Sequence, residues 1–469
     1  MFVKQLYTGC LSEAAYFIES NGEAAVVDPL RDIDIYLQLA AERKATIKYI
    51  FETHFHADFV SGHLDLAKAT GATIVYGPNT ETSYAVHIAR DGETFSLGEL
   101  TVQVLHTPGH TLESACYLLK DEKGKAACVF TGDTLFVGDV GRPDLSQKGE
   151  ELSTEDLAGM LFDSLHSKLM PLADDVIVYP AHGPGSACGK ALGPDTVSTI
   201  GEEKKTNYAM KAETKDDFIK AVTEGLSAPP QYFPINAQIN KEGYDSIAEV
   251  LQKGLRALTV SDVKKLLQED ALLLDTRRDE EFTQSFIPEA IFIGLDGRFA
   301  EWAGSLLPFD KEIVLVCEPG TESEAVTRLA RVGFSKMAGY LAGGMDAWKA
   351  AGEPIDMIIN VEADELAMDI PFDENLVVLD VRRPAEFADG HVKDAVSLPL
   401  NEMTNPANLS QLEEEQNIYV HCAGGYRSVI AASLLKRQGI HNLRNVLGGW
   451  SKIREQEKIP VEKEKSVLN

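Results

Sequence analysis

The sequence predicts an α/β protein that is built from several domains. Its 469 residues are too many for one ordinary domain, so two to four domains are expected. The N-terminal half alternates short apolar strands with turn signals and helical stretches, as in AAVVD (24–28) and ACVFTGD (127–133). The C-terminal half contains an internal repeat, which predicts two tandem copies of one small α/β domain.

The repeat is aligned without a gap. LLLDTRRDEEF (272–282) matches VVLDVRRPAEF (377–387), and VCEPGTES (316–323) matches HCAGGYRS (421–428). The offset is constant, because 380 − 275 and 422 − 317 both give 105. Each copy has its strand and helix signals in the order that predicts a parallel sheet.

These patterns predict three domains. We expect an N-terminal domain at 1–245, a first repeat copy at 255–355 and a second copy at 360–460. The segment 227–244 is rich in proline and has sparse periodicity, so we expect it to be an extended connector at the end of the first domain.

The composition narrows the partners and the compartment. A formal charge of −29 would repel phosphates, which argues against nucleic acid and anionic membranes as partners. The N-terminal residues lack a signal-peptide pattern, and no apolar run approaches the ~20 residues of a membrane span. Six scattered cysteines without a CxxC pair are typical of reduced cytosolic thiols. We therefore expect a cytoplasmic enzyme, and we expect it to form a homo-oligomer.

The sharpest local signal is THFHADFVSGH (53–63), which follows a predicted strand. Two histidines at i and i+2, with Asp58 two residues further on, suit a metal site, although loop histidines can also make ordinary hydrogen bonds. Three further motifs place a polar residue at a strand end: HTPGHT (106–111), FTGDTLF (130–136) and YPAHG (179–183).

Four such motifs in this order resemble the metallo-β-lactamase superfamily, over about the N-terminal half of the chain. The resemblance implies an αββα sandwich with a metal at one edge of the paired sheets. The dinuclear hydrolases of that superfamily, including glyoxalase II, read H-x-H-x-D-H, whereas the sixth residue here is Phe59, which cannot bind a metal. The branch with one metal that this chain resembles is the persulfide dioxygenases.

The resemblance also implies the roles of the polar residues at the centre. The implied ligands are His54, His110 and Asp133, and the residues implied to support them from outside the coordination sphere are His56, Asp58 and His182. Two histidines and one carboxylate form the facial triad of non-haem Fe(II) oxygenases, whose open positions can hold a persulfide sulfur and O₂. Zinc would polarise water but has no redox chemistry, so we expect one mononuclear Fe(II) ion.

Two more residues near this centre are candidates. GDVGRPDL (138–145) resembles a family segment, and Arg142 either holds a carboxylate of the thiol carrier or pairs with Asp144. Cys188 is either a small packed cysteine or, in its glycine-rich and lysine-flanked setting, a catalytic thiolate close to the iron. The fusions of a persulfide dioxygenase with a sulfurtransferase are similar to this chain at that cysteine, whereas single-domain persulfide dioxygenases have an aromatic-containing stretch there.

The second repeat copy carries a nucleophile. HCAGGYRS (421–428) places Cys422 between a strand and a helix, where loop N–H groups and the helix N-terminus favour a thiolate. Arg427 adds a cation able to hold sulfite or thiosulfate. The C-x-G-G-x-R-S loop looks like that of an active rhodanese, a sulfurtransferase. Its expected substrate-binding residues are Gly424, Gly425 and Ser428.

The first copy is predicted to be degenerate. It keeps Cys317, but Glu322 stands where the second copy has Arg427, and Pro319 removes one loop N–H. Acidic neighbours would raise the pKa of the thiol and repel oxyanions, so we expect a structural or docking module. Asp275 with Arg277, and Asp380 with Arg382, are expected to be structural ion pairs.

The resemblance implies a persulfide dioxygenase coupled to a sulfurtransferase in sulfide detoxification. Its expected substrates are O₂ and a small thiol persulfide, carried by glutathione, coenzyme A or a similar thiol, and its products are sulfite and, at Cys422, thiosulfate. The direction of sulfur transfer between the modules stays open. Two alternatives also stay open: a zinc-dependent thioester hydrolase of the glyoxalase II type, and a non-catalytic scaffold that senses persulfides.

Overall fold

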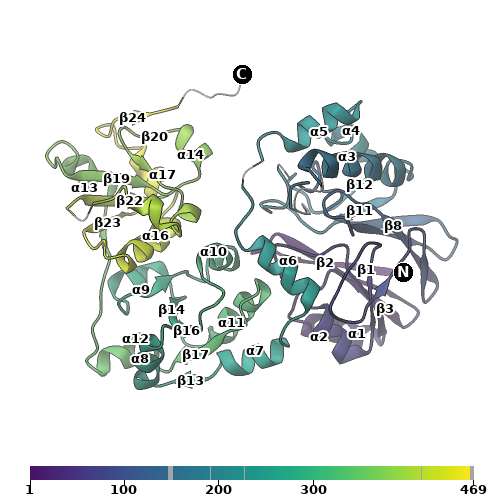
Figure 1. Cartoon of the computed structure of the whole chain (residues 1–469), viewed down its shortest axis with the longest axis horizontal. Helices are drawn as coiled ribbons and strands as arrows, with labels where there is room; N and C mark the ends of the chain where they lie inside the picture. The colour runs from purple at the N-terminus through teal and green to yellow at the C-terminus, as the bar shows by residue number, and fades with distance from the viewer. Residues whose placement is uncertain (146–151, 191, 227, 414, 465–469) are drawn as a thin grey trace. The chain divides into compact units, whose positions relative to one another are not determined.

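The computed structural model describes residues 1–145, 152–190, 192–226, 228–413 and 415–464. The chain divides into two compact units (Figure 1). The first unit contains Met1–Glu249 and Leu329–Ser335, and the second contains Val250–Arg328 and Lys336–Asn469.

The first unit contains two six-stranded sheets. The first sheet has the order β1 (Phe2–Thr8), β2 (Glu13–Ser20), β3 (Glu23–Val27), β4 (Thr46–Phe51), β5 (Thr73–Tyr76), β6 (His87–Ile88). The second has the order β12 (Ser198–Thr199), β11 (Ile177–Pro180), β10 (Ala126–Gly132), β9 (Ala115–Lys120), β8 (Leu100–His106), β7 (Thr94–Leu97). The helices are α1 (Asp34–Arg43), α2 (His63–Thr70), α3 (Thr154–Ser164), the π-helix η1 (Leu165–Leu169), α4 (Ile200–Thr206), α5 (Lys215–Thr223) and α6 (Phe233–Glu242), with α7 (Ile247–Gly254) at the boundary between the units.

The two sheets pack face to face between outer helices. One apolar cluster joins their inner faces, for example Tyr16 and Phe51 of the first sheet with Tyr117 and Phe130 of the second. Alternate residues of β2 face outward instead, so Phe17 packs with the cluster that includes α1 and α2. A third cluster lies between the second sheet and α3, α4 and α5. The αββα sandwich that the sequence resemblance implied is confirmed.

The prediction of an extended connector at 227–244 is wrong for most of that segment, because residues Phe233–Glu242 form α6. Residue 227 lies outside the described residues. Pro234 occupies the first turn of α6, where a missing N–H costs nothing. The helix buries Asn236 and Asn240 rather than a full apolar stripe, so its hydrophobic periodicity in the sequence was weak.

The second unit contains two five-stranded sheets of the same topology. The first copy has the order β13 (Ala257–Leu258), β17 (Met337–Leu341), β16 (Ile313–Val316), β14 (Leu272–Asp275), β15 (Ile291–Phe292), with helices α8 (Val260–Gln268), α9 (Asp279–Gln284), α10 (Phe299–Leu306), α11 (Glu322–Arg331) and α12 (Gly344–Ala350). The second has the order β18 (Ile359–Val361), β23 (Leu443–Val446), β22 (Asn417–His421), β19 (Leu376–Asp380), β21 (Val396–Ser397), with helices α13 (Ala363–Asp369), α14 (Pro384–Ala388), the 3₁₀ helix η2 (Leu400–Glu402), α15 (Pro406–Leu409), α16 (Tyr426–Arg437) and α17 (Gly449–Ile453). A separate two-stranded sheet pairs β20 (His391–Val392) with β24 (Val461–Glu462).

Every described pairing inside these two five-stranded sheets is parallel, so the prediction of tandem copies with parallel sheets is confirmed. The expected ion pairs are confirmed as well. Arg277 contacts Asp275 at 2.7 Å and donates to the carbonyl of Ser285. In the second copy Arg382 pairs with Asp380 and donates to Gly390 in the same way. Both pairs are buried at matching strand ends, where they fix the chain that follows.

None of the described helices combines the length and the apolar character needed to cross a membrane. All six cysteines lie among the described residues, and each is a free thiol.

Candidate metal centre and sulfur-transfer loop

Three side chains that follow strand ends converge in the first unit. His54 follows β4, His110 follows β8, and Asp133 follows β10. Their ligand atoms lie within 4.8 Å of one another. The Oδ2 atom of Asp133 is 3.3 Å from Nε2 of His110 and 3.7 Å from Nε2 of His54. The structure therefore brings together the three residues that the sequence proposed as ligands.

The hydrogen bonds of these residues leave one atom with a lone pair on each side chain free to bind a cation. Among the described residues, Nε2 of His54 and Oδ2 of Asp133 have no hydrogen-bond partner, although both atoms are buried. Buried polar atoms normally have hydrogen-bond partners, so these two atoms are expected to contact a bound ion instead. The opposite atom, Nδ1 of His110, lies 2.8 Å from the carbonyl oxygen of Arg142, which accepts its proton and leaves the lone pair on Nε2. Two imidazole nitrogens and one carboxylate oxygen fit a single iron or zinc ion.

The protonation of His54 and Asp133 suits metal binding. Burial and the neighbouring His56 lower the pKa of His54 well below its ordinary value, so the ring is neutral. Burial opposes ionisation of Asp133, but His182 and His54 outweigh it and hold the pKa of that carboxyl far below its usual range. A neutral imidazole and a carboxylate are the forms that bind metals.

His182 lies behind the centre. Its Nδ1 is 2.8 Å from Oδ1 of Asp133, and its Nε2 is 2.8 Å from Oδ2 of Asp58. Burial disfavours the charged ring, but the two carboxylates raise the pKa of His182 well above its ordinary value. The imidazolium thus orients Asp133 so that its other oxygen faces the two histidines.

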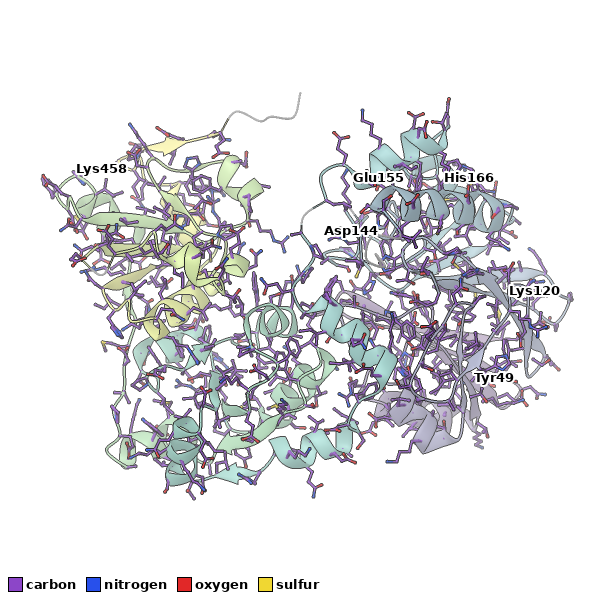
Figure 2. The ribbon with its side chains drawn as sticks, in the orientation of Figure 1. Tyr49, Lys120, Asp144, Glu155, His166 and Lys458 are labelled. Carbon is purple, nitrogen blue, oxygen red and sulfur yellow. The ribbon has the colours of Figure 1, made fainter. Side chains whose placement is uncertain are left out.

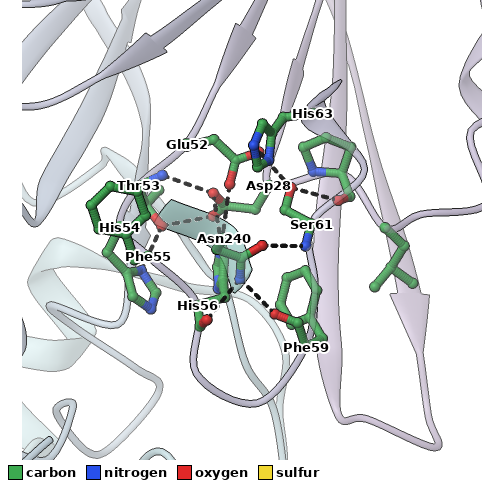
Figure 3. Close-up of polar contacts among 12 residues, drawn as sticks. Asp28, Glu52, Thr53, His54, Phe55, His56, Phe59, Ser61, His63 and Asn240 are labelled. Carbon is green, nitrogen blue, oxygen red and sulfur yellow. Dashed lines mark hydrogen bonds and ion pairs between the residues drawn. The ribbon is translucent and has the colours of Figure 1, made fainter. Parts of the chain in front are cut away.

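His56 does not join the three ligands but groups with two acids, Asp28 and Glu52 (Figure 3). Its Nε2 lies 3.1 Å from Oδ1 of Asp28 and 3.8 Å from Oε2 of Glu52. Its ring packs against Phe59 with centroids 4.3 Å apart and the ring planes tilted by 32°. Asp28 also accepts from the backbone N–H and the hydroxyl of Thr53, so it holds the start of the metal-binding loop.

Helix α6 holds the same loop from the other side (Figure 3). The side-chain amide of Asn240 donates to the carbonyls of His56 and Phe59, at 2.8 and 2.9 Å, and its oxygen accepts from the N–H of Ser61. The sequence analysis missed this residue. The signal that it offered was two asparagines at i and i+4, and neither suggested burial.

A second ion has a poorer set of donors. Phe59 is fully buried and offers no ligand atom where dinuclear hydrolases have a histidine. Asp58, His182 and Cys188 form another group within 4.8 Å, but both nitrogens of His182 already bond to carboxylates. Next to the three ligands, Asp58, His182 and Cys188 therefore offer fewer free atoms to a second ion. The separate group of Asp28, Glu52 and His56 keeps Nε2 of His56 and Oε2 of Glu52 buried without a hydrogen-bond partner among the described residues.

Arg142 pairs with Asp144, which is labelled in Figure 2. Its Nε and Nη2 each lie 2.7 Å from a carboxylate oxygen of Asp144, and its Nη1 donates to the carbonyl of Ala187. Of the two alternatives for Arg142, the structure therefore shows the ion pair with Asp144, not a cation that is available to a carboxylate of the thiol carrier. The backbone of Arg142 still serves the centre, because its carbonyl orients His110.

Cys188 lies beside the centre, as predicted, and its side chain is buried. Burial, Asp58 and Asp133 raise the pKa of its thiol well above the usual value. The expected cationic neighbour points elsewhere, because Nζ of Lys190 donates to the carbonyls of Ala221 and Glu224. Of the two alternatives that the sequence left open for this residue, these surroundings favour the small packed cysteine.

In the second unit, Cys422 lies at the end of β22 and before α16. The N–H of Gly425 donates to its sulfur at 3.1 Å. Gly425 has a φ of 119°, a conformation open to glycine, which turns this N–H toward the thiol. Ser428 was expected to bind substrate, but its buried hydroxyl donates to the carbonyl of Gly425 and so braces the loop. Gly424 has open space around its Cα.

Arg427 is not a free cation. Its two terminal nitrogens contact the carboxylate of Glu386 at 2.7 and 2.8 Å. The guanidinium lowers the pKa of Glu386 to about 2, so the pair is ionised at neutral pH. The sequence analysis missed Glu386, although it lies in the segment VVLDVRRPAEF that revealed the repeat.

In the first copy, the N–H equivalent to that of Gly425 has a different acceptor. Gly320 aligns with Gly425, since 425 − 320 is 105, and its N–H donates to the carboxylate of Glu322 rather than to the cysteine. Burial, followed by Glu322 and Asp275, raises the pKa of Cys317 to about 12. The prediction that acidic neighbours would raise this pKa is confirmed, although burial is the larger cause.

Comparisons with known proteins agree with the two-part architecture. The family model of the metallo-beta-lactamase superfamily matches residues 8–182, and that of the rhodanese-like domain matches residues 259–351 and 362–456. The probable hydroxyacylglutathione hydrolase glo2 of Schizosaccharomyces pombe is 34% identical over 182 residues, which is 38% of this chain and 66% of the relative. The chain thus spans slightly less than two thirds of that relative's length.

Two solved structures cover more of the chain. A metallo-beta-lactamase from Staphylococcus aureus is 34% identical, with a TM-score of 0.66, and the match covers 72% of this chain and 98% of that chain. ETHE1 from Myxococcus xanthus is 33% identical, with a TM-score of 0.44, covering 51% of this chain and 98% of that chain.

Proposed function

Because this chain belongs to the metallo-beta-lactamase superfamily and carries two rhodanese-like domains, we propose that it is an iron-dependent persulfide dioxygenase coupled to a sulfurtransferase. The observation that carries this proposal is the buried group of His54, His110 and Asp133. Two histidines and one carboxylate present free donor atoms, while Phe59 removes a ligand from the second site. A facial set of this kind is typical of non-haem iron oxygenases.

The residues of the centre have separate tasks. His54, His110 and Asp133 would hold the ion, and iron(II) bound there would supply the redox chemistry with O₂ that zinc lacks. His182 keeps one oxygen of Asp133 engaged, and the carbonyl of Arg142 fixes the proton of His110. Burial of all three ligands excludes bulk water, which protects a reactive sulfur from side reactions.

The overall reaction balances. A thiol persulfide, RSSH, reacts with O₂ and water to give the thiol and sulfite. The terminal sulfur loses four electrons, which O₂ accepts, and water supplies the third oxygen atom of sulfite. The thiol carrier is glutathione, coenzyme A or a similar small thiol.

Cys422 would then convert sulfite to thiosulfate. Its thiolate takes the terminal sulfur of a second persulfide and releases the thiol. Sulfite attacks that sulfur, the S–S bond to Cys422 breaks, and thiosulfate leaves with the thiolate restored. Carrying both modules on one chain raises the effective concentration of sulfite at the loop. The same residues can run the transfer in reverse, from thiosulfate to the thiol.

The curated relatives favour a second candidate, a zinc-dependent thioester hydrolase of the glyoxalase II type. That reaction needs a metal-bound water and no redox chemistry. The absence of a ligand at Phe59 and the satisfied hydrogen bonds of His182 argue against the dinuclear form of such an enzyme. A non-catalytic persulfide sensor, the third candidate, would not need the open donor atoms of the centre.

Metal analysis combined with an oxygen-electrode assay separates these candidates. Purified protein is expected to contain about one iron per chain, the number that one facial triad holds. It is expected to consume O₂ when glutathione persulfide is added, with sulfite and thiosulfate as products. Zinc together with O₂-independent cleavage of S-lactoylglutathione would overturn the proposal in favour of the hydrolase. Iron without O₂ consumption would favour the sensor.

Replacing Glu386 is expected to strengthen binding of anionic sulfur donors. Glu386→Gln removes the negative charge that pairs with Arg427 and leaves the guanidinium free for the substrate. The KM for thiosulfate should therefore fall at least about tenfold, the effect of roughly one hydrogen bond to a charged group. The measurement is thiocyanate formation from thiosulfate and cyanide. Glu455→Gln, which changes an exposed acid of the same domain, is the control. An unchanged or higher KM in Glu386→Gln would mean that the pair acts as a unit in binding.

A further inference from the structure

The active loop of the second rhodanese copy is anchored on the degenerate first copy. Tyr426, the first residue of α16, extends its ring to the segment that follows β15 of the first copy. Its hydroxyl donates to the carbonyl of Gly294 at 2.6 Å. The ring also meets Phe292 edge to face, with centroids 6.1 Å apart.

Gly297 of the first copy makes room for this ring, whereas Gly294 is only in ordinary contact with it. A Cβ atom at Gly297 would lie 2.5 Å from Cζ of Tyr426, and one at Gly294 would lie 3.4 Å from Cε2. Neither glycine has a positive φ, so the backbone does not require glycine there. Glycine is required at position 297 because any side chain there would collide with the ring of Tyr426.

The seat of Tyr426, which we define as residues 294–297, is itself held in place. Arg328 of α11 donates to the carbonyl of Leu295 at 2.6 Å. Helix α16 is fixed to the first copy at two further points. Ser433 accepts from the N–H of Phe292, and Lys436 pairs with Asp356 at 2.8 Å, at the end of the first copy. Both ends of the contact therefore have fixed positions.

The anchor lies next to the group that contacts the nucleophile. Gly425 immediately precedes Tyr426, and its N–H is the donor to the sulfur of Cys422. A movement of Tyr426 would shift Cα of Gly425 and with it the peptide between Gly424 and Gly425, which carries that N–H. The donor is present before the reaction begins, and such preorganised donors stabilise charge that develops in a transition state.

We propose that Tyr426 is a positioning residue for sulfur transfer at Cys422, and that the degenerate copy supplies its seat at residues 294–297. The inference rests on the proposed sulfurtransferase function. It also gives the first copy a task that does not depend on Cys317. In that copy the N–H of Gly320 donates to Glu322 rather than to Cys317, whereas residues 294–297 contact the loop of the second copy.

A double-mutant cycle on the full chain tests the inference. The assay uses thiosulfate and cyanide: Cys422 takes the outer sulfur of thiosulfate and releases sulfite, and cyanide then removes that sulfur as thiocyanate. The variants are Tyr426→Phe, Gly297→Ala, Tyr426→Leu and the pair Gly297→Ala with Tyr426→Leu. For each, kcat and KM are measured together with O₂ uptake and the folded fraction by circular dichroism.

Loss of the hydroxyl in Tyr426→Phe should lower kcat about fivefold with little change in KM, the effect of one hydrogen bond. Gly297→Ala should lower kcat by at least as much, because its Cβ displaces the ring. In the Tyr426→Leu background, Gly297→Ala should have little further effect, since the ring that it would strike is gone. O₂ uptake should be unchanged in all four variants.

The matched control is Tyr419→Phe, which removes a tyrosine hydroxyl that donates to Asp369 in the same domain. It should leave kcat unchanged. Unchanged kcat in Tyr426→Phe, or additive effects of Gly297→Ala and Tyr426→Leu, would overturn the inference while leaving the sulfurtransferase function in place. A wild-type chain that forms no thiocyanate would overturn both. If Gly297→Ala does not fold, Tyr426→Phe still decides.

Discussion

Asp133→Ala is expected to remove the bound metal and abolish O₂ uptake with a thiol persulfide. Asp133 is the only anionic donor of the three ligands, and its Oδ2 faces both histidines at 3.3 and 3.7 Å. Residues that merely orient a ligand change metal affinity by about 10–100-fold, so losing the ligand itself should cost more. Iron per chain by elemental analysis and O₂ consumption in the electrode are the two measurements.

A second variant separates the loss of the ligand from the loss of the fold. Asp133→Asn keeps the shape of the side chain but removes the charge that His182 contacts, and it should lose metal and activity as well. Asp175→Ala, an exposed acid of the same unit that pairs with Lys125, should keep both. Retention of iron and of O₂ uptake in folded Asp133→Ala would show that the metal is bound elsewhere.

Cys422→Ser is expected to keep O₂ uptake at the wild-type rate while thiosulfate formation falls to the level without enzyme. The variant removes the sulfur that receives the sulfane atom and keeps the loop, because the hydroxyl can still accept from the N–H of Gly425. Sulfite should then accumulate in place of thiosulfate. Ion chromatography of the products after incubation with a defined persulfide gives the ratio.

The repeat offers a matched control for that experiment. Cys317→Ser changes the equivalent cysteine of the first copy, whose thiol has a pKa of about 12 because of burial, Glu322 and Asp275. It should leave the ratio of sulfite to thiosulfate unchanged. If Cys422→Ser also leaves the ratio unchanged, the two modules are not coupled in the way proposed. If Cys317→Ser alters it, the first copy takes part in sulfur transfer.

Much of the candidate site could be predicted from the sequence because its parts are local. Each ligand lies just after a strand or in the short turn that follows it, so the strands before His54, His110 and Asp133 already marked the edge of a sheet. The repeat with its constant offset showed the tandem domains, and Glu322 at the position of Arg427 showed which copy is degenerate. These features depend on spacing and residue type, and both can be read along the chain.

Pairings between distant residues could not be predicted in this way. The connector became α6, and Asn240 in it bonds to carbonyls some 180 positions away in the metal-binding loop. Arg427, which was expected to hold an anionic substrate, pairs with Glu386, 41 positions away. For Arg142 the sequence left two alternatives open, and the structure shows the pair with Asp144. A sequence shows which side chains are charged, but it does not show whether another residue of the protein already pairs with that charge.

The sequence by itself determined the order of the domains, the three residues of the metal centre as candidates, and Cys422 as the candidate nucleophile. Only the tertiary structure decided which of their neighbours are engaged: His56 with Asp28, Cys188 beside two carboxylates, and Tyr426 on the first rhodanese copy. The physical reason is that strands, helices and turns follow from local patterns, whereas burial and hydrogen-bond partners depend on which segments pack together. In this chain, several residues that were expected to contact substrate instead contact other residues of the two sites and hold them in position.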